Sequence, residues 1–105
     1  MKGKIMAKTS KFDAAAHLDS PETIAAYLTE AFETNDPAFI SLAIGTVAKA
    51  RGMASVASEA GLSRESLYKS LSGNTKPEFD TVRKVLNAVG VKLVVEPIDG
   101  PAEAA

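Results

Sequence analysis

Residues 57–73 read ASEAGLSRESLYKSLSG, and two short helix-forming stretches in them are separated only by Gly61, Leu62 and Ser63. Neither stretch reaches the roughly 12–15 residues that an isolated helix needs to be stable in water. Both therefore depend on tertiary packing. A glycine between them permits the left-handed backbone of a sharp turn. The spacing predicts two crossed helices, over about 53–60 and 64–71.

Three longer helices are predicted around this pair. Ser-Pro at 20–21 and Asp-Pro at 36–37 are typical of helix starts, because Ser and Asp cap a helix and Pro fits its first position. With apolar residues at helical spacing, they predict helices over 21–34 and 37–51, and a third apolar stripe covers 79–89. The side chains expected in the core are Ile24, Leu28, Ala31, Phe32, Ile40, Ala43, Ile44, Val47, Val56, Ala57, Ala60, Leu62, Leu67, Leu71, Phe79, Val82, Leu86 and Val89.

The sequence changes character after the last helix. Residues 91–97, VKLVVEP, are β-branched and roughly alternating, which predicts one strand. A single strand needs a partner, either its own domain or the same strand of a second copy. An unpaired edge this apolar would favour aggregation. We expect pairing, with Val91, Leu93 and Val95 on the packed side.

The chain of 105 residues has the size of one small domain. We expect an all-α domain of five helices with a short C-terminal β-strand over residues 12–97. A basic segment (1–11) and a tail (98–105) are expected to be disordered on either side. Met1 and Met6 both fit as the initiator.

Several function classes are excluded or unsupported. The chain has no cysteine, which excludes disulfides, thiolate metal sites and thiol catalysis. His17 is the lone histidine, expected to pack or to lie on the surface, and no phosphate-binding loop follows the glycines. We therefore expect no enzyme, no metal and no cofactor. No apolar run approaches the roughly 18 residues of a membrane span, and the start lacks a signal peptide's apolar segment, so we expect a cytoplasmic protein.

Charge is distributed in blocks, although the formal net charge is only −1. Residues 12–36 contain six acidic side chains and no Lys or Arg, whereas residues 49–84 contain seven Lys or Arg against four acids. The division predicts two faces with different partners, the acidic one suited to a basic protein. The alternative is that both are ordinary solvated helix faces.

The helix predicted over 64–71 leaves outward polar side chains that burial alone does not require. In a helix-turn-helix, the second helix lies in the major groove of DNA, where Arg reads guanine and Ser bonds to bases or phosphate. Arg64 and Ser66 are the expected base readers, and Tyr68 is expected to pack its ring on the domain with its hydroxyl toward a phosphate. The alternative is a helical hairpin with solvated polar residues. The predicted DNA-binding residues are Ser55, Ser63, Arg64, Glu65, Ser66, Tyr68, Lys69, Asn74, Thr75 and Lys76.

Three segments together resemble the addiction-module antidote proteins, antitoxins with a phage-repressor-type (Xre-like) helix-turn-helix. They are FDAAAHLDSPETIAAYLTEAF (12–32), RGMASVASEAGLSRESLYKSLS (51–72) and FDTVRKVLNAVGVKLVVEP (79–97). The resemblance implies a homodimeric repressor that binds a palindromic operator in double-stranded DNA of its own operon. It also implies a toxin partner, a small ribonuclease-like protein related to RelE or ParE. The matching recognition-helix positions are Ser63, Arg64, Glu65, Ser66 and Lys69.

The chain departs from the phage-repressor pattern at the start of the first short helix. Many such domains have Thr and Gln there, and the Gln supports a phosphate contact. This chain has Gly52 and Met53, and Ser55 is the residue expected to replace the contact. Two alternatives stay open: an interaction module that sequesters a toxin without binding DNA, and an orphan phage-type regulator without a toxin.

Overall fold

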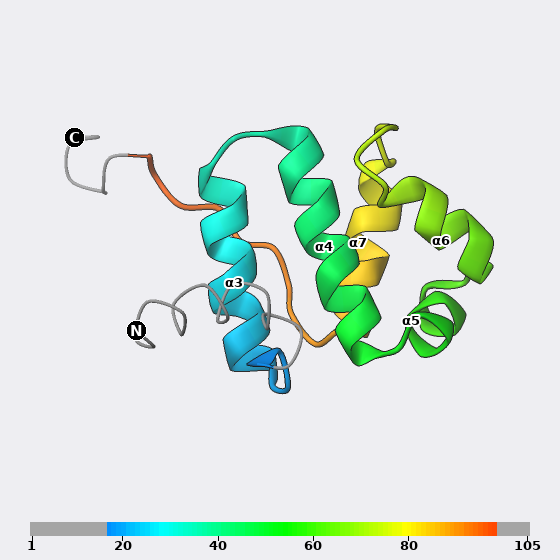
Figure 1. Ribbon diagram of the computed structural model, residues 1–105. Helices are drawn as coiled ribbons and strands as arrows, with labels where there is room; N and C mark the ends of the chain where they lie inside the picture. The colour runs from blue at the N-terminus through cyan, green and yellow to red at the C-terminus, as the bar shows by residue number, and fades with distance from the viewer. Residues whose placement is uncertain (1–16, 99–105) are drawn as a thin grey trace, which may run out of the picture.

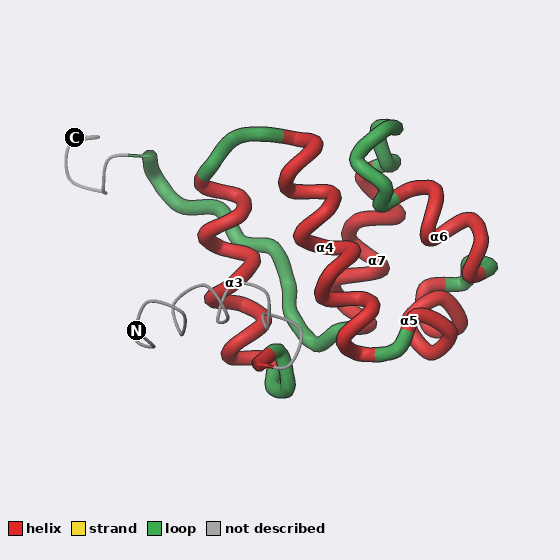
Figure 2. Tube along the Cα trace, in the orientation of Figure 1, coloured by secondary structure: helices red, strands yellow, loops and turns green. Residues whose placement is uncertain are grey.

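The computed structural model describes residues 17–98, which form five helices joined by loops (Figures 1 and 2). The five expected helices are therefore confirmed, each within about two residues of its expected bounds. The expected segment 1–11 and residues 99–105 of the expected tail lie outside the described residues. The helices are α3 (Pro21–Glu33), α4 (Pro37–Arg51), α5 (Met53–Ala60), α6 (Arg64–Ser70) and α7 (Phe79–Ala88).

Two side-chain caps fix the starts of α3 and α4. The Ser20 hydroxyl accepts from the Thr23 backbone N–H at 3.2 Å, and the Thr23 hydroxyl accepts from the Ser20 N–H at 3.3 Å. The Asp36 carboxylate accepts from the N–H of Ala38 at 3.1 Å. These bonds satisfy donors that the first helical turn leaves free. The expected starts are therefore confirmed by the predicted capping residues.

Two glycines turn the chain from α4 through α5 into α6. Gly52 has φ +106°, and α4 and α5 meet there at 108°. Gly61 has φ +75°, and the next N–H, from Leu62, donates to the Ala57 carbonyl at 2.8 Å. Only glycine adopts such angles at little cost. The result is a compact right-hand lobe in Figure 1, in which α5 packs against both α6 and α7.

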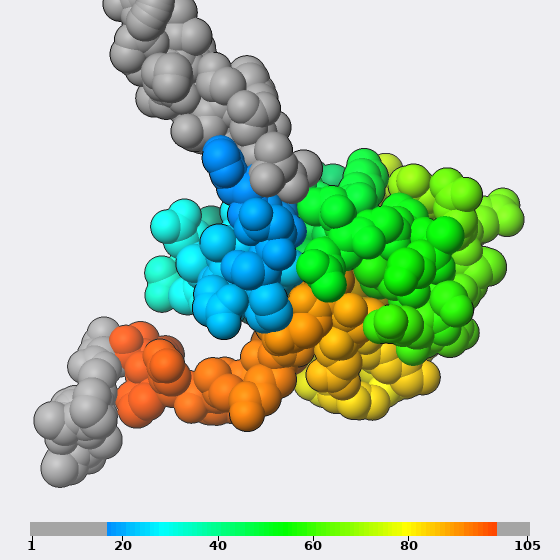
Figure 3. Space-filling view, turned by 90° about the horizontal axis from the view of Figure 1, so that it is seen from below, coloured from blue at the N-terminus to red at the C-terminus, as the bar shows by residue number. Residues whose placement is uncertain are grey.

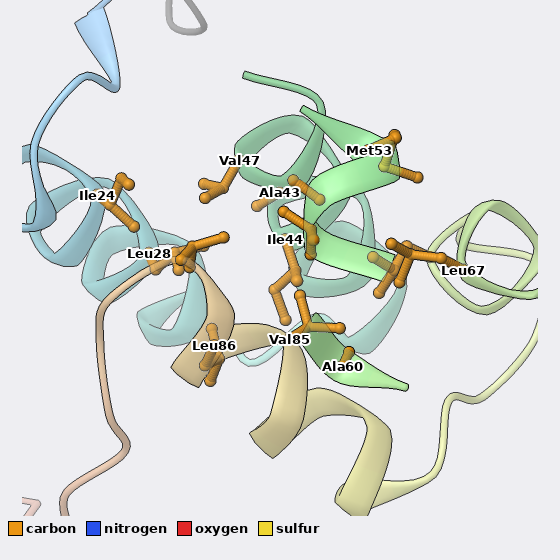
Figure 4. Close-up of a cluster of buried hydrophobic side chains, with 14 of the residues drawn as sticks. Ile24, Leu28, Ala43, Ile44, Val47, Met53, Ala60, Leu67, Val85 and Leu86 are labelled. Carbon is orange, nitrogen blue, oxygen red and sulfur yellow. The ribbon is translucent and has the colours of Figure 1, made fainter. Parts of the chain in front are cut away.

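A single apolar core joins the five helices (Figure 4). Ile24 of α3, Ile44 of α4 and Val85 of α7 are fully buried in it. Leu67 enters it from α6. The predicted stripes of α3, α4 and α5 supply most of the rest, whereas Phe32, Ile40, Leu62 and Val82 are only half-buried at its rim.

The prediction that Phe79 lies in the core was wrong. Its side chain is 69% exposed, whereas Val85, which was not assigned to the core, is fully buried. Burial increases along α7 from exposed Phe79 through half-buried Val82 to buried Leu86. The first turn of the helix therefore starts beyond the core, although it carries the same apolar stripe.

The strand expected over residues 91–97 is not formed, and no residue from 17 to 98 is in a strand. The segment leaves α7 as an extended arm over the surface (Figure 3). Val91 is half-buried, but Val95, expected on the packed side, is 98% exposed. A strand exists only where a second backbone supplies a ladder of hydrogen bonds, and the described part of one copy offers none.

Within residues 17–98, no single helix is long and apolar enough to cross a membrane. Only α4 and α5 taken together, with the 108° bend between them, reach that length and composition.

We expect Gly45→Val to lower the free energy of unfolding by about 1–3 kcal/mol, because it overpacks a helix contact. A Cβ at Gly45 would lie 3.2 Å from the Leu71 carbonyl oxygen and 3.4 Å from the Leu71 Cβ. Urea unfolding followed by circular dichroism measures the change. Gly45→Ala is the graded control, since it adds only the Cβ and gains helix propensity. Equal effects of Val and Ala would contradict this close approach of α4 to Leu71.

Candidate functional site

The outward helix of the molecule is α6, at the opposite end from α3 in Figure 1. Leu67 is its only buried residue, and it is 0% exposed. Arg64, Glu65, Ser66, Tyr68 and Lys69 are all exposed, as expected for side chains that face a partner. Leu67, together with the buried C-cap residue Leu71, holds the helix to the domain, and the outward side chains are exposed.

The serines at the start of α6 have a structural role. The Ser63 hydroxyl accepts from the Ser66 N–H at 3.0 Å and lies 3.0 Å from the Ser66 hydroxyl, to which it donates. Ser63 therefore caps the helix, as expected from its position. The Ser66 hydroxyl accepts this bond and keeps its own proton for an outside acceptor.

Tyr68 brings two cations together. The Nζ of Lys49, from the last turn of α4, and the Cζ of Arg64 each lie 5.9 Å from the centre of the Tyr68 ring. A cation over an aromatic face is attracted by the ring's negative quadrupole. The ring is 43% exposed. Tyr68 therefore orients Arg64 and draws Lys49 to the α6 surface.

The loop after α6 folds back onto the end of that helix. The hydroxyls of Thr75 and Ser72 donate to the Lys69 carbonyl oxygen at 3.1 and 3.0 Å, and the Asn74 N–H donates to the Ser72 hydroxyl at 3.1 Å. Both hydroxyls thus bind one carbonyl oxygen at the end of the helix, where acceptors lack helical partners. These bonds keep Asn74, Thr75 and Lys76 exposed beside α6.

The exposed cations of the last turn of α4, of α6 and of the loop after it form what we call the basic cluster, with these members: Lys49, Arg51, Arg64, Lys69 and Lys76. Within residues 17–98, no carboxylate lies within 4.0 Å of any of them. The acidic block is carried largely by α3, at the other end of the molecule, with Glu22, Glu30 and Glu33 exposed. The two predicted charge blocks thus occupy opposite ends.

Residues 8–97 match the family described as "probable addiction module antidote protein". The chain belongs to this family. A relative from Haemophilus influenzae, described only as an uncharacterized protein, is 45% identical over 85 residues, which are 81% of this chain and 88% of that protein. No solved structure matches the chain. The resemblance to antidote proteins is confirmed, and membership implies a toxin partner.

Sequence reasoning missed two members of the basic cluster of this antidote protein. Lys49 and Arg51 lie in the last turn of α4, which contacts α5 and thereby approaches α6. The count of cations in residues 49–84 included both, but helix spacing alone does not show that α4 ends beside α6. The position of the end of α4 relative to α6 depends on the turn at Gly52.

Arg83 and Lys84 are exposed on α7 and pair with one carboxylate. Asp80 accepts from Arg83 at 2.9 Å and lies 3.1 Å from the Lys84 Nζ. The hydrogen bond from Arg83, followed by that from Lys84, lowers the pKa of the Asp80 carboxyl. These two cations are thus compensated by Asp80, whereas no carboxylate in residues 17–98 lies within 4.0 Å of a cation of the basic cluster.

The first turn of α5 carries the substitute proposed for the missing Gln. Gly52 caps α5 without any side-chain hydrogen bond, and Ser55 is exposed on the first turn. Met53 is buried in the core. His17 is exposed, and the residues from 17 to 98 contain no group of three His, Cys, Asp or Glu that could hold a metal ion.

Proposed function

We propose that this antidote protein is a DNA-binding antitoxin whose α5–α6 pair is a helix-turn-helix. The observation that carries the proposal is the basic cluster together with the outward helix α6, since DNA phosphates supply the negative partners that the described residues lack. The protein represses its own operon from the cytoplasm and acts by binding rather than by catalysis.

Roles within the site follow from geometry and chemistry. Arg64, oriented by Tyr68, reads guanine, and Ser66 bonds to a base edge with its free proton. Glu65 accepts from cytosine, while Lys69 and the loop residues Asn74 to Lys76 contact phosphates. Ser55 meets the backbone at the uncapped start of α5.

The antitoxin binds a palindromic operator as a homodimer. In this mode of binding, two recognition helices enter successive major grooves about 34 Å apart, so the protein's two-fold axis matches that of the DNA. The exposed acids of α3 then lie away from the duplex and remain available to a basic toxin related to RelE or ParE. We expect a short basic reading frame directly upstream of the gene for this chain.

One observation favours a second candidate, an interaction module that has lost DNA binding. Met53 occupies the position of the Gln that supports a phosphate contact in many phage-repressor-like domains, and its side chain is buried. Binding of the toxin would then be the whole function. An orphan regulator without a toxin is the remaining alternative, and the upstream gene distinguishes it.

Fluorescence anisotropy with a duplex from the chain's own upstream region tests the proposal, with a scrambled duplex as control. Sequence-selective binding supports the helix-turn-helix. A folded dimer that binds neither duplex selectively, at low or at physiological salt, would leave the interaction module as the better explanation.

We expect Arg64→Ala to weaken operator binding by about 1–3 kcal/mol and to relax the preference for operator over scrambled duplex. The substitution removes a bidentate base contact that Arg64 makes with the operator and does not make with the scrambled duplex. Arg83→Ala is the matched control, because Arg83 is an exposed cation already paired with Asp80. An equal loss on both duplexes would show that Arg64 contacts phosphate instead.

A further inference from the structure

The arm after α7 exposes backbone and apolar side chains together. The Val91 N–H donates to the Leu86 carbonyl at 3.0 Å, and from there to Ile98 the described chain makes no further backbone hydrogen bond. Val94 is 66% exposed, and Val95 and Ile98 are almost fully exposed. A β-branched segment with free donors and acceptors is a template for strand pairing.

The two sides of the arm differ. In an extended chain, alternate side chains point to opposite faces, so Leu93 and Val95 share one face and Lys92, Val94 and Glu96 share the other. Leu93 is the less exposed apolar member of the first face. A groove of about 610 Å³ beside α3 is lined by Leu28 and Phe32 and by arm residues of both faces, among them Leu93 and Val94. The first face is thus apolar, and the second carries one cation and one anion around a valine.

The charges on the second face are complementary to themselves in one register. If two arms pair antiparallel with Val94 opposite Val94, Lys92 of each copy lies opposite Glu96 of the other. Leu93 then lies opposite Val95 on the apolar face. A shift by one residue places Glu96 opposite Val91 or Leu93 and leaves Lys92 without an acid. Opposite charges directly across a strand pair stabilise it.

We propose that residues 91–97 pair antiparallel with the same segment of a second copy, with the two-fold axis at Val94. This pairing satisfies the free backbone groups and covers Val95, which is 98% exposed in one copy. It deepens the proposed function, since it supplies the homodimer that a palindromic operator requires, but it can be tested without DNA.

Cysteine cross-linking tests the register directly, because the chain has no cysteine of its own. Opposite Cα atoms in an antiparallel pair lie about 4.5–5.5 Å apart, within the range of a disulfide, whereas diagonal neighbours lie about 7–8 Å apart. Val94→Cys should therefore oxidise to a covalent dimer in good yield, and Val95→Cys should not. Equal yields overturn the register, and no cross-link in either variant overturns the pairing.

Charge exchange supplies an independent readout. Lys92→Glu and Glu96→Lys should each raise the dimer dissociation constant roughly tenfold, because each places like charges opposite one another twice. The double variant Lys92→Glu/Glu96→Lys should restore the wild-type value. Sedimentation measures the constants, and circular dichroism checks the fold. The proposal is overturned if both single variants dimerise more weakly and the double variant does not recover. It is also overturned if the wild type is monomeric.

Duplex binding by the wild type is measured in parallel to separate the two proposals. A covalent dimer of the Val94→Cys variant, together with a wild type that does not bind duplex, supports the strand pairing and overturns DNA binding. Selective duplex binding without that cross-link supports DNA binding and overturns the strand pairing.

Discussion

Leu67→Ala should lower the free energy of unfolding by about 2–5 kcal/mol and the melting temperature by roughly 10 °C or more. Leu67 is fully buried and is the only buried residue of α6, which packs against α5. The substitution removes apolar contacts and leaves a cavity that the short helix cannot fill. The total free energy of unfolding of a domain is about 5–15 kcal/mol, so this loss is a large part of it.

Urea and thermal unfolding of Leu67→Ala measure this effect, with Lys69→Ala as the matched control. Lys69 is exposed on the same helix, so its truncation should change stability by only about 0.5 kcal/mol. Hydrogen exchange should also show α6 opening before the rest of the domain. A loss below about 1 kcal/mol for Leu67→Ala would contradict the role of Leu67 in attaching α6 to the core.

Raising the salt concentration from about 50 to about 200 mM should weaken operator binding by about a thousandfold or more. That range corresponds to roughly six or more phosphate contacts, which a dimer reaches if each copy uses three cations of the basic cluster. These cations have no carboxylate within 4.0 Å among the described residues, so nearby acids do not already compensate them. Anisotropy titrations over a salt series give the slope.

Lys69→Ala should reduce that slope by about two in a dimer, one phosphate contact per copy, and weaken binding to every duplex about equally. Lys84→Ala is the control, because Lys84 is paired with Asp80 on α7. If affinity depends only weakly on salt concentration while selectivity is retained, phosphate contacts are not the main source of affinity. A sequence-selective loss in Lys69→Ala would exchange the roles given to Lys69 and Arg64.

Local signals allowed the helices to be predicted with little error. Ser20 and Asp36 form the expected caps, and Gly61 takes the expected left-handed turn. Each of these features depends on a few adjacent residues, because caps and turns are closed by hydrogen bonds over about two to five positions. The exposed positions of α6 follow in the same way from the spacing around Leu67.

Contacts between distant segments could not be predicted in this way. Phe79 and Leu86 belong to one apolar stripe, but only the length of α7 that overlaps α5 and α3 decides which of them is buried. Lys49 reaches the Tyr68 ring because α4 ends beside α6, 19 residues later in the sequence. Similarly, the close approach of Gly45 to Leu71 depends on helix crossing and not on either local sequence.

The sequence by itself determined five helices, their boundaries, the polar outer side of α6 and membership in the antidote family, because all of these depend on local spacing and residue type. The tertiary structure alone decided the basic cluster, the burial along α7 and the unpaired state of residues 91–97. Burial and electrostatic environment depend on which surfaces meet in space, and a strand depends on a second backbone beside it.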